Sequence, residues 1–110
     1  MKKIKVLLIT LLLVVGLTGC GGSQPDELVG RWAWTSDSSW VYTFNADGTG
    51  NRPGNNFTWE VRGNNELRLT LTSGLNNGFT ERWRYSITDG VLTIDSLQLS
   101  GLTWSYRRLN

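Results

Sequence analysis

The side chains that most often carry out catalysis are scarce in this chain of 110 residues, which has one cysteine and no histidine. Serines such as Ser38, Ser39 and Ser73 lie in segments that read as turns, without a base to activate them. A glycosidase would need two acids at roughly 5–9.5 Å, but alternation along the chain places Glu60 and Glu81 on opposite faces. We therefore expect a protein that is not an enzyme and uses no cofactor.

One acid occupies an unusual position. Glu81 follows the alternation that points Phe79 and Trp83 inward, so its carboxylate is predicted on the inner face of a strand. There it would anchor the polar end of a ligand or pair with an inward arginine such as Arg108, because an unpaired buried charge is costly. The alternative is that Glu81 lies at the rim, or that a bulge turns it to solvent. The sequence favours this alternative.

A second group of oxygen-bearing side chains is spaced a little like a calcium loop. Asn45, Asp47 and Asn51 surround Gly48, but the group contains one acid, whereas calcium takes about six to eight oxygens, several of them from acids. The Asp-Gly pair is already explained as a hairpin turn, since both residue types tolerate positive φ. We expect a turn here and no metal site.

The elements that must position these residues are strands. Apolar and polar residues alternate in eight short stretches separated by turn residues, which predicts strands at 28–34, 40–44, 49–52, 57–62, 66–72, 79–88, 91–95 and 102–108. The pattern predicts an all-β fold, a small up-and-down antiparallel β-barrel over residues 28–110, because closure removes the exposed sheet edges. An open meander or a sandwich is the competing architecture.

Six tryptophans, three tyrosines and three phenylalanines must find places in this domain. Eight-stranded barrels enclose either a packed core or one small ligand. So many large rings in so short a chain favour a filled interior at native packing density, and a ligand would then meet a shallow aromatic mouth. We place that mouth near Trp34, Trp40 and Glu81.

The first 19 residues read as an export signal. Lys2, Lys3 and Lys5 precede an apolar run from Val6 to Leu17, and small residues follow. As a transmembrane helix this run of 12 residues would cover about 18 Å, short of the ~30 Å of hydrocarbon in a bilayer. We expect residues 1–19 to be a cleaved signal peptide.

The four residues Leu17-Thr18-Gly19-Cys20 resemble the lipobox of bacterial lipoproteins, in which the cysteine becomes the diacylated first residue of the mature protein. The resemblance implies lipidation of Cys20 and anchoring to the cell membrane on its extracytoplasmic side, because two acyl chains hold a protein stably. Residues 20–27 would form the lipidated end and a flexible tether. A buried or free thiol is the alternative for a lone exported cysteine.

The charge balance argues against nucleic acid as a partner. The net charge of +2 includes the three lysines of the signal, so the remaining chain has eight arginines against nine acids and a net charge of −1. A nucleic-acid-binding domain needs a basic face in its folded part. The outward charges read as cross-strand pairs on a solvated wall, although the same arginines would also suit an interaction surface; they are Glu60, Arg62, Arg68, Arg82, Arg84 and Asp95.

A short motif at the start of the domain resembles that of the lipocalins. Gly30-Arg31-Trp32 is similar to the Gly-x-Trp with which lipocalins begin their first strand. In that family a late arginine packs over the tryptophan, a role that the resemblance gives to Arg107 or Arg108. It thus implies structural roles for Gly30, Trp32 and Arg108.

The layout of the whole segment 28–110 is similar to that of small bacterial lipocalin-like (calycin-type) lipoproteins, including the hairpin at 42–50. Most of these have no assigned function. The chain is far shorter than true lipocalins and lacks their long lid loop and disulfide, so their roomy ligand cavity is not implied.

Two functions follow from these patterns. The first is a non-catalytic module that binds a small apolar or amphipathic ligand at the mouth. The second is an envelope protein-interaction or inhibitor module, with a filled barrel, no small-molecule ligand, and the outer wall or loops as its contact surface.

Overall fold

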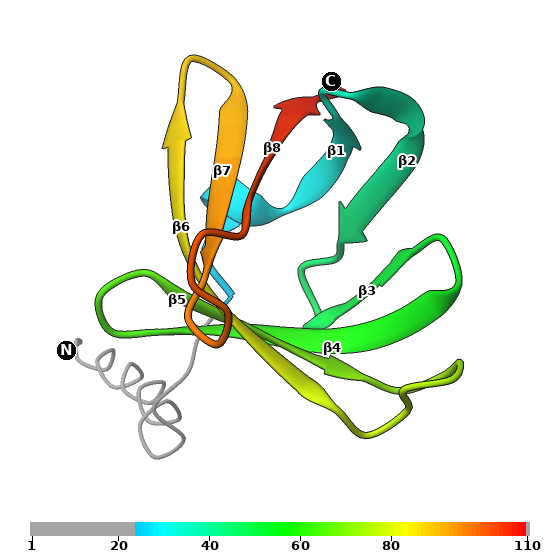
Figure 1. The fold of residues 1–110 in the computed structure, drawn as a ribbon. Helices are drawn as coiled ribbons and strands as arrows, with labels where there is room; N and C mark the ends of the chain where they lie inside the picture. The colour runs from blue at the N-terminus through cyan, green and yellow to red at the C-terminus, as the bar shows by residue number, and fades with distance from the viewer. Residues whose placement is uncertain (1–23, 110) are drawn as a thin grey trace, which may run out of the picture.

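The computed structural model describes residues 24–109, which form a closed eight-stranded barrel preceded by a short 3-10 helix. The helix η2 is Asp26–Leu28, and the strands are β1 (Gly30–Trp34), β2 (Asp37–Phe44), β3 (Thr49–Arg52), β4 (Asn55–Arg62), β5 (Glu66–Leu71), β6 (Thr80–Thr88), β7 (Val91–Ser96) and β8 (Thr103–Arg108). Each strand pairs antiparallel with the next, and β8 returns to pair with β1 (Figure 1). The predicted all-β, up-and-down barrel is confirmed.

The predictions for the signal peptide and for Cys20 fall outside the described residues. The tether was predicted to reach residue 27, but its last residues contact the barrel. The side-chain amide of Gln24 donates to the carbonyl of Trp59, at 3.0 Å, and the hydroxyl of Tyr85 donates to a carboxylate oxygen of Glu27, at 2.6 Å. The folded unit therefore begins before residue 28.

The first strand also begins later than predicted. Leu28, expected in the strand, ends helix η2 and is fully buried, and β1 starts at Gly30. Gly30 has a φ of +135°, and a Cβ there would lie 3.0 Å from the guanidinium of Arg108. Glycine is the residue that adopts such a φ without steric cost, so the turn between helix η2 and β1 depends on it.

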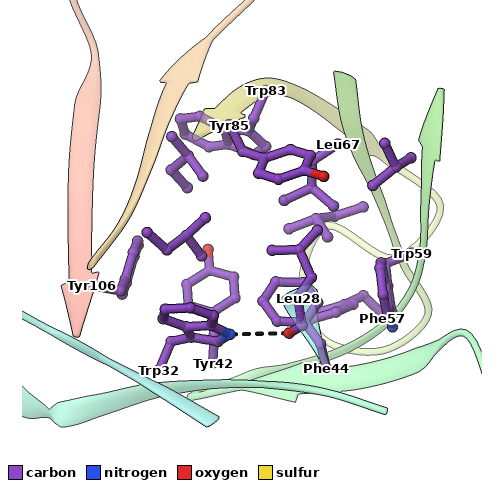
Figure 2. Close-up of a cluster of buried hydrophobic side chains, with 14 of the residues drawn as sticks. Leu28, Trp32, Tyr42, Phe44, Phe57, Trp59, Leu67, Trp83, Tyr85 and Tyr106 are labelled. Carbon is purple, nitrogen blue, oxygen red and sulfur yellow. Dashed lines mark hydrogen bonds between the residues drawn. The ribbon is translucent and has the colours of Figure 1, made fainter. Parts of the chain in front are cut away.

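Leu28 closes one end of the barrel. The indole Nε1 of Trp32 donates to the carbonyl of Leu28 at 3.0 Å, and Leu28 lies among the buried rings (Figure 2). The guanidinium carbon of Arg108 stands 4.2 Å from the ring centroid of Trp32. Its two terminal nitrogens donate to the carbonyls of Val29 and Glu27. The resemblance suggested Arg107 or Arg108 for the position over the Trp32 ring, and Arg108 is the one that lies there.

The core fills the barrel from this closed end. It consists of alternate residues that face inward, namely Leu28, Trp32, Tyr42, Phe44, Phe57, Trp59, Val61, Leu67, Leu69, Leu71, Trp83, Tyr85, Leu92, Ile94 and Tyr106. Gly50 shares the inner face, and a Cβ there would collide with the ring of Phe57 and the carbonyl of Thr43. The chain thus places its smallest residue where β3 crosses the most crowded part of the core.

The parity prediction is wrong for Phe79, whose side chain is 53% exposed. β6 begins one residue later, at Thr80, so Phe79 lies in the preceding loop and does not follow the alternation of the strand. Strict alternation with the buried Trp32 would turn Ala33 outward, but Ala33 is buried beside the register shift between Ala33 and Trp34. A bulge breaks simple alternation because it adds a residue on one strand only.

We predict that Leu28→Ala lowers the free energy of unfolding by about 2–5 kcal/mol, because it opens a cavity at a fully buried position that the barrel wall cannot collapse to fill. Leu75→Ala is the matched control, since Leu75 is 98% exposed, and it is expected to change stability by about 0.5 kcal/mol or less. Denaturant unfolding followed by circular dichroism measures both. Equal effects would show that helix η2 does not seal the barrel.

Candidate ligand-binding pocket

The opposite end of the barrel contains a pocket of about 430 Å³. Four connections surround this end, because in an up-and-down barrel alternate loops lie together; they are residues 35–36, 53–54, 72–79 and 97–102. Helix η2 and the remaining turns belong to the closed end. The pocket is lined by Trp34, Trp40, Tyr42, Arg52, Glu81, Trp83, Leu102, Trp104 and Tyr106. Its volume lies within the ~300–1,000 Å³ of typical small-molecule sites.

The walls of the pocket are largely aromatic. The rings of Trp34 and Trp104 meet edge to face, with centroids 5.4 Å apart, an arrangement that aromatic pairs prefer. Trp40 is 38% exposed, so an apolar ring at the entrance still contacts water. Leu75, Phe79 and Leu99 are the other exposed large apolar side chains among the described residues, and all three belong to the loops at this end.

A cluster of four polar side chains, Arg52, Glu81, Tyr42 and Trp83, lies against these walls, and we call it the polar floor. Arg52 binds Glu81 in a bidentate manner, with Nη1 to Oε1 at 3.0 Å and Nη2 to Oε2 at 2.8 Å. Arg52 Nη1 also donates to the hydroxyl of Tyr42 at 2.8 Å, and Trp83 Nε1 donates to Glu81 Oε1 at 3.1 Å. Asn55 Oδ1 accepts from Arg52 Nε at 3.3 Å.

Two strands that are not neighbours supply the ion pair. Arg52 is the last residue of β3, and Glu81 is the second of β6. Their side chains are 12% and 17% exposed. Charge-assisted bidentate pairs are among the stronger hydrogen-bonded contacts, and the additional donors and acceptors around them offset the cost of removing both charges from water.

The structure distinguishes the alternatives for Glu81. It lies at the open end of the barrel, as the second residue of β6, and no bulge turns it to solvent, since it pairs in register with Leu69. Its partner is Arg52 and not the expected Arg108, which lies over Trp32 at the other end. Side chains fill the closed end, as predicted, and the pocket lies at the open end, where an aromatic mouth was predicted. The three residues assigned to a mouth, Trp34, Trp40 and Glu81, do line this one pocket.

Sequence reasoning missed Arg52. The available signal was its parity with Gly50, because two residues separated by one along a strand share a face, and Gly50 pairs with the inward-facing Phe44 and Phe57. The strand itself was predicted at 49–52, but no role was assigned to its last residue. Its terminal residue in fact supplies the one cation that lines the pocket among residues 24–109.

Burial and charge shift the proton equilibria of the floor. Burial alone would lower the pKa of Arg52, but its hydrogen bonds to Glu81 and Tyr42 and the negative charge of Glu81 raise it, so the guanidinium stays ionised. Burial is also the main cause that raises the pKa of Tyr42 and of Tyr106. At neutral pH the guanidinium of Arg52 is therefore charged, and the phenols of Tyr42 and Tyr106 are uncharged.

The carboxylate of Glu81 accepts three hydrogen bonds from Arg52 and Trp83. In the part of the chain that the structure describes, no three histidine, cysteine, aspartate or glutamate side chains gather as metal ligands. Asp47 forms the predicted turn, accepting from the amide and the hydroxyl of Thr49.

The outer wall carries paired charges, but two of the three ion pairs each lie along a single strand, whereas the sequence predicted pairs across strands. Arg62 Nε donates to Glu60 at 2.9 Å, and Arg68 Nε donates to Glu66 at 2.8 Å, with Arg82 3.6 Å from the same carboxylate. Exposed pairs of this kind contribute about 0.2–1 kcal/mol each. Three of the wall arginines thus already have acidic partners within the sheet.

Comparison of the chain with protein-family models, curated proteins and solved structures finds no match. Between residues 24 and 109, no helix has the length and apolarity required to cross a bilayer.

The protein has three tyrosines, and all three have raised pKa values: Tyr42 and Tyr106 in the pocket, and Tyr85, where burial and then the hydrogen bond to Glu27 raise it. A tyrosine with a raised pKa contributes stability to the folded state, and this contribution is fully present at a pH below the ordinary tyrosine pKa of about 10. This contribution is lost as the pH rises above that value, because unfolded tyrosines release protons that folded ones keep.

We therefore predict that no tyrosine titrates normally near pH 10 in the folded protein and that unfolding becomes easier above that pH. Ultraviolet absorbance of the phenolate reports ionisation, and circular dichroism at each pH reports folding. The same absorbance measured in denaturant is the control, where all three should titrate together near the ordinary value. A normal tyrosine titration in the folded chain would contradict the buried arrangement.

Proposed function

We propose that this protein binds a small apolar or amphipathic ligand in the open end of its barrel and catalyses no reaction. The observation that carries the proposal is the pocket of about 430 Å³, which has aromatic walls and one polar cluster. Ligand sites are typically apolar concavities in which a few polar groups orient the ligand. The mouths of β-barrels are common positions for such sites.

We propose further that the domain is lipocalin-like. Its support is the closed ring of eight antiparallel strands, together with the contacts at Gly30, Trp32 and Arg108, which follow the pattern that suggested the family. The helix before β1 and the arginine at the end of β8 together cover the same tryptophan. Barrels of this size hold one small ligand when side chains do not fill them.

The third part of the proposal is location: an extracytoplasmic lipoprotein, anchored to the cell membrane through Cys20. Its support is the signal-like stretch 1–19 and the lipobox-like residues that end at Cys20. Gln24 enters the domain at the closed end, where it contacts Trp59. An anchored barrel would then be attached by its closed end, and its pocket would open at the end away from the tether.

The alternative is an envelope protein-interaction or inhibitor module that holds no small molecule. It would use the arginines of the outer wall, but Arg62, Arg68 and Arg82 already have acidic partners. The pocket is the more specific feature, and ligand binding is therefore our first choice.

We predict that the uncharged apolar dye N-phenyl-1-naphthylamine binds the protein and gains fluorescence, and that Trp40→Ala weakens binding about tenfold. Trp40 lines the pocket and is 38% exposed, so its removal takes away ring contact at little cost in stability. Phe79→Ala is the matched control, because Phe79 is an exposed aromatic residue at the same end that does not line the pocket.

If the dye fails to bind, or if both variants weaken it equally, the pocket is not a ligand site. The interaction module would then become the better proposal.

We also predict that Cys20→Ser moves the protein out of the membrane fraction, since the change removes the thiol that would carry the acyl chains. Cell fractionation, with mass spectrometry of the N-terminal peptide, measures both the location and the modification. Ser23→Ala, in the adjacent tether, is the control and should leave both unchanged. Membrane association that survives the loss of Cys20 would exclude anchoring through this residue.

A further inference from the structure

The polar floor has no net charge, and this limits the ligands that the pocket accepts. Arg52 and Glu81 satisfy each other through two parallel hydrogen bonds. A ligand carboxylate in contact with Arg52 would also meet Glu81, and an ammonium group in contact with Glu81 would meet Arg52. In either case one ionic group must be buried without a full partner, which is costly in a desolvated site.

The floor still has capacity for hydrogen bonding. Arg52 Nη1 uses both of its hydrogens, on Tyr42 and Glu81, whereas Nη2 has one acceptor among the described residues, Glu81 Oε2. A terminal guanidinium nitrogen carries two hydrogens, and a carboxylate oxygen accepts about two bonds. Arg52 Nη2 therefore retains a donor, and Glu81 Oε2 retains an acceptor, on atoms 2.8 Å apart.

A donor beside an acceptor is complementary to a ligand group that itself both accepts and donates. A primary carboxamide does so with its oxygen and its NH₂ group, and a hydroxyl does so with one oxygen. Neither brings a charge to the site. A bound ligand without such a group would leave these atoms unsatisfied, at a cost that favours ligands with it.

The walls of the pocket determine which kind of body the rest of the ligand can have. Trp34, Trp40, Leu102 and Trp104 present apolar surface, which suits an aromatic or branched apolar body. The volume of about 430 Å³ equals that of about 14 water molecules at ~30 Å³ each. This fits a compact molecule of one to a few rings.

We infer that the ligand is a compact, uncharged molecule with an apolar, aromatic-sized body and a terminal carboxamide or hydroxyl, and that the Arg52–Glu81 pair excludes organic acids and amines of the same shape. This rests on the proposed function, since it names the class of ligand for that same pocket.

Three probes of one shape test the inference: 4-phenylbutanamide, 4-phenylbutanoate and 4-phenylbutylammonium. The full chain is held in lipid nanodiscs at neutral pH, empty nanodiscs are the blank, and displacement of N-phenyl-1-naphthylamine reports affinity. We expect the amide to bind at least about tenfold more tightly than either ion, because it alone satisfies the floor without burying an uncompensated charge.

Charge variants then reverse the preference. Glu81→Gln leaves Arg52 unpaired and should make the carboxylate the tightest of the three probes, whereas Arg52→Gln should make the ammonium the tightest. Glu60→Gln and Arg62→Gln are the matched controls, since they alter the same charges at a wall pair outside the pocket, and the amide should remain preferred. Circular dichroism verifies that each variant is folded.

The outcomes separate this inference from the proposed function. If the dye binds but wild type takes the carboxylate as tightly as the amide, or if both floor variants keep the wild-type order, the inference is wrong and the ligand pocket stands. If neither the dye nor any probe binds, both are wrong. A preference that reverses with Glu81→Gln and with Arg52→Gln, but not with the wall variants, supports the inference.

Discussion

The fold depends on one contact, in which the start and the end of the folded chain meet around the ring of Trp32. Trp32 is fully buried, donates to the carbonyl of Leu28, and is covered by the guanidinium of Arg108. Arg108 also binds the carbonyls of Glu27 and Val29. A cation over an indole face adds attraction beyond hydrophobic burial. Arg108 is the last residue of β8, the strand that closes the barrel against β1. It therefore completes the sheet and also holds helix η2 in place.

Sealing one end makes the two ends of the barrel unequal. Large rings packed around Leu28 fill the closed half (Figure 2). At the other end the largest rings stand along the wall: Trp34 and Trp104 contact each other edge to face, and Trp40 lies at the opening. An eight-stranded barrel has little interior to spare. The cavity therefore exists because these three tryptophans line its surface and do not fill its axis.

The polar floor lines the cavity near the open ends of β3 and β6. An ion pair in such a place costs desolvation energy that its own attraction does not fully offset, so the surrounding bonds matter. Tyr42, Trp83 and Asn55 supply them. Each of these side chains is held by a strand, and together they keep Arg52 and Glu81 in one geometry. The same bonds that stabilise the pair determine which of its atoms remain available to a ligand.

The strands, their order around the ring and most of the inward faces followed from the sequence, because alternation is a local property that each strand displays within a few residues. Phe79 and Ala33 are the exceptions, at a strand end and at a register shift. The Gly30–Trp32–Arg108 contact also followed, from a resemblance. The partner of Glu81 did not, since β3 and β6 are not neighbours and only closure of the barrel brings Arg52 across to it. The pocket likewise depended on tertiary structure, because free volume is what remains after all side chains are packed, and no single strand specifies it.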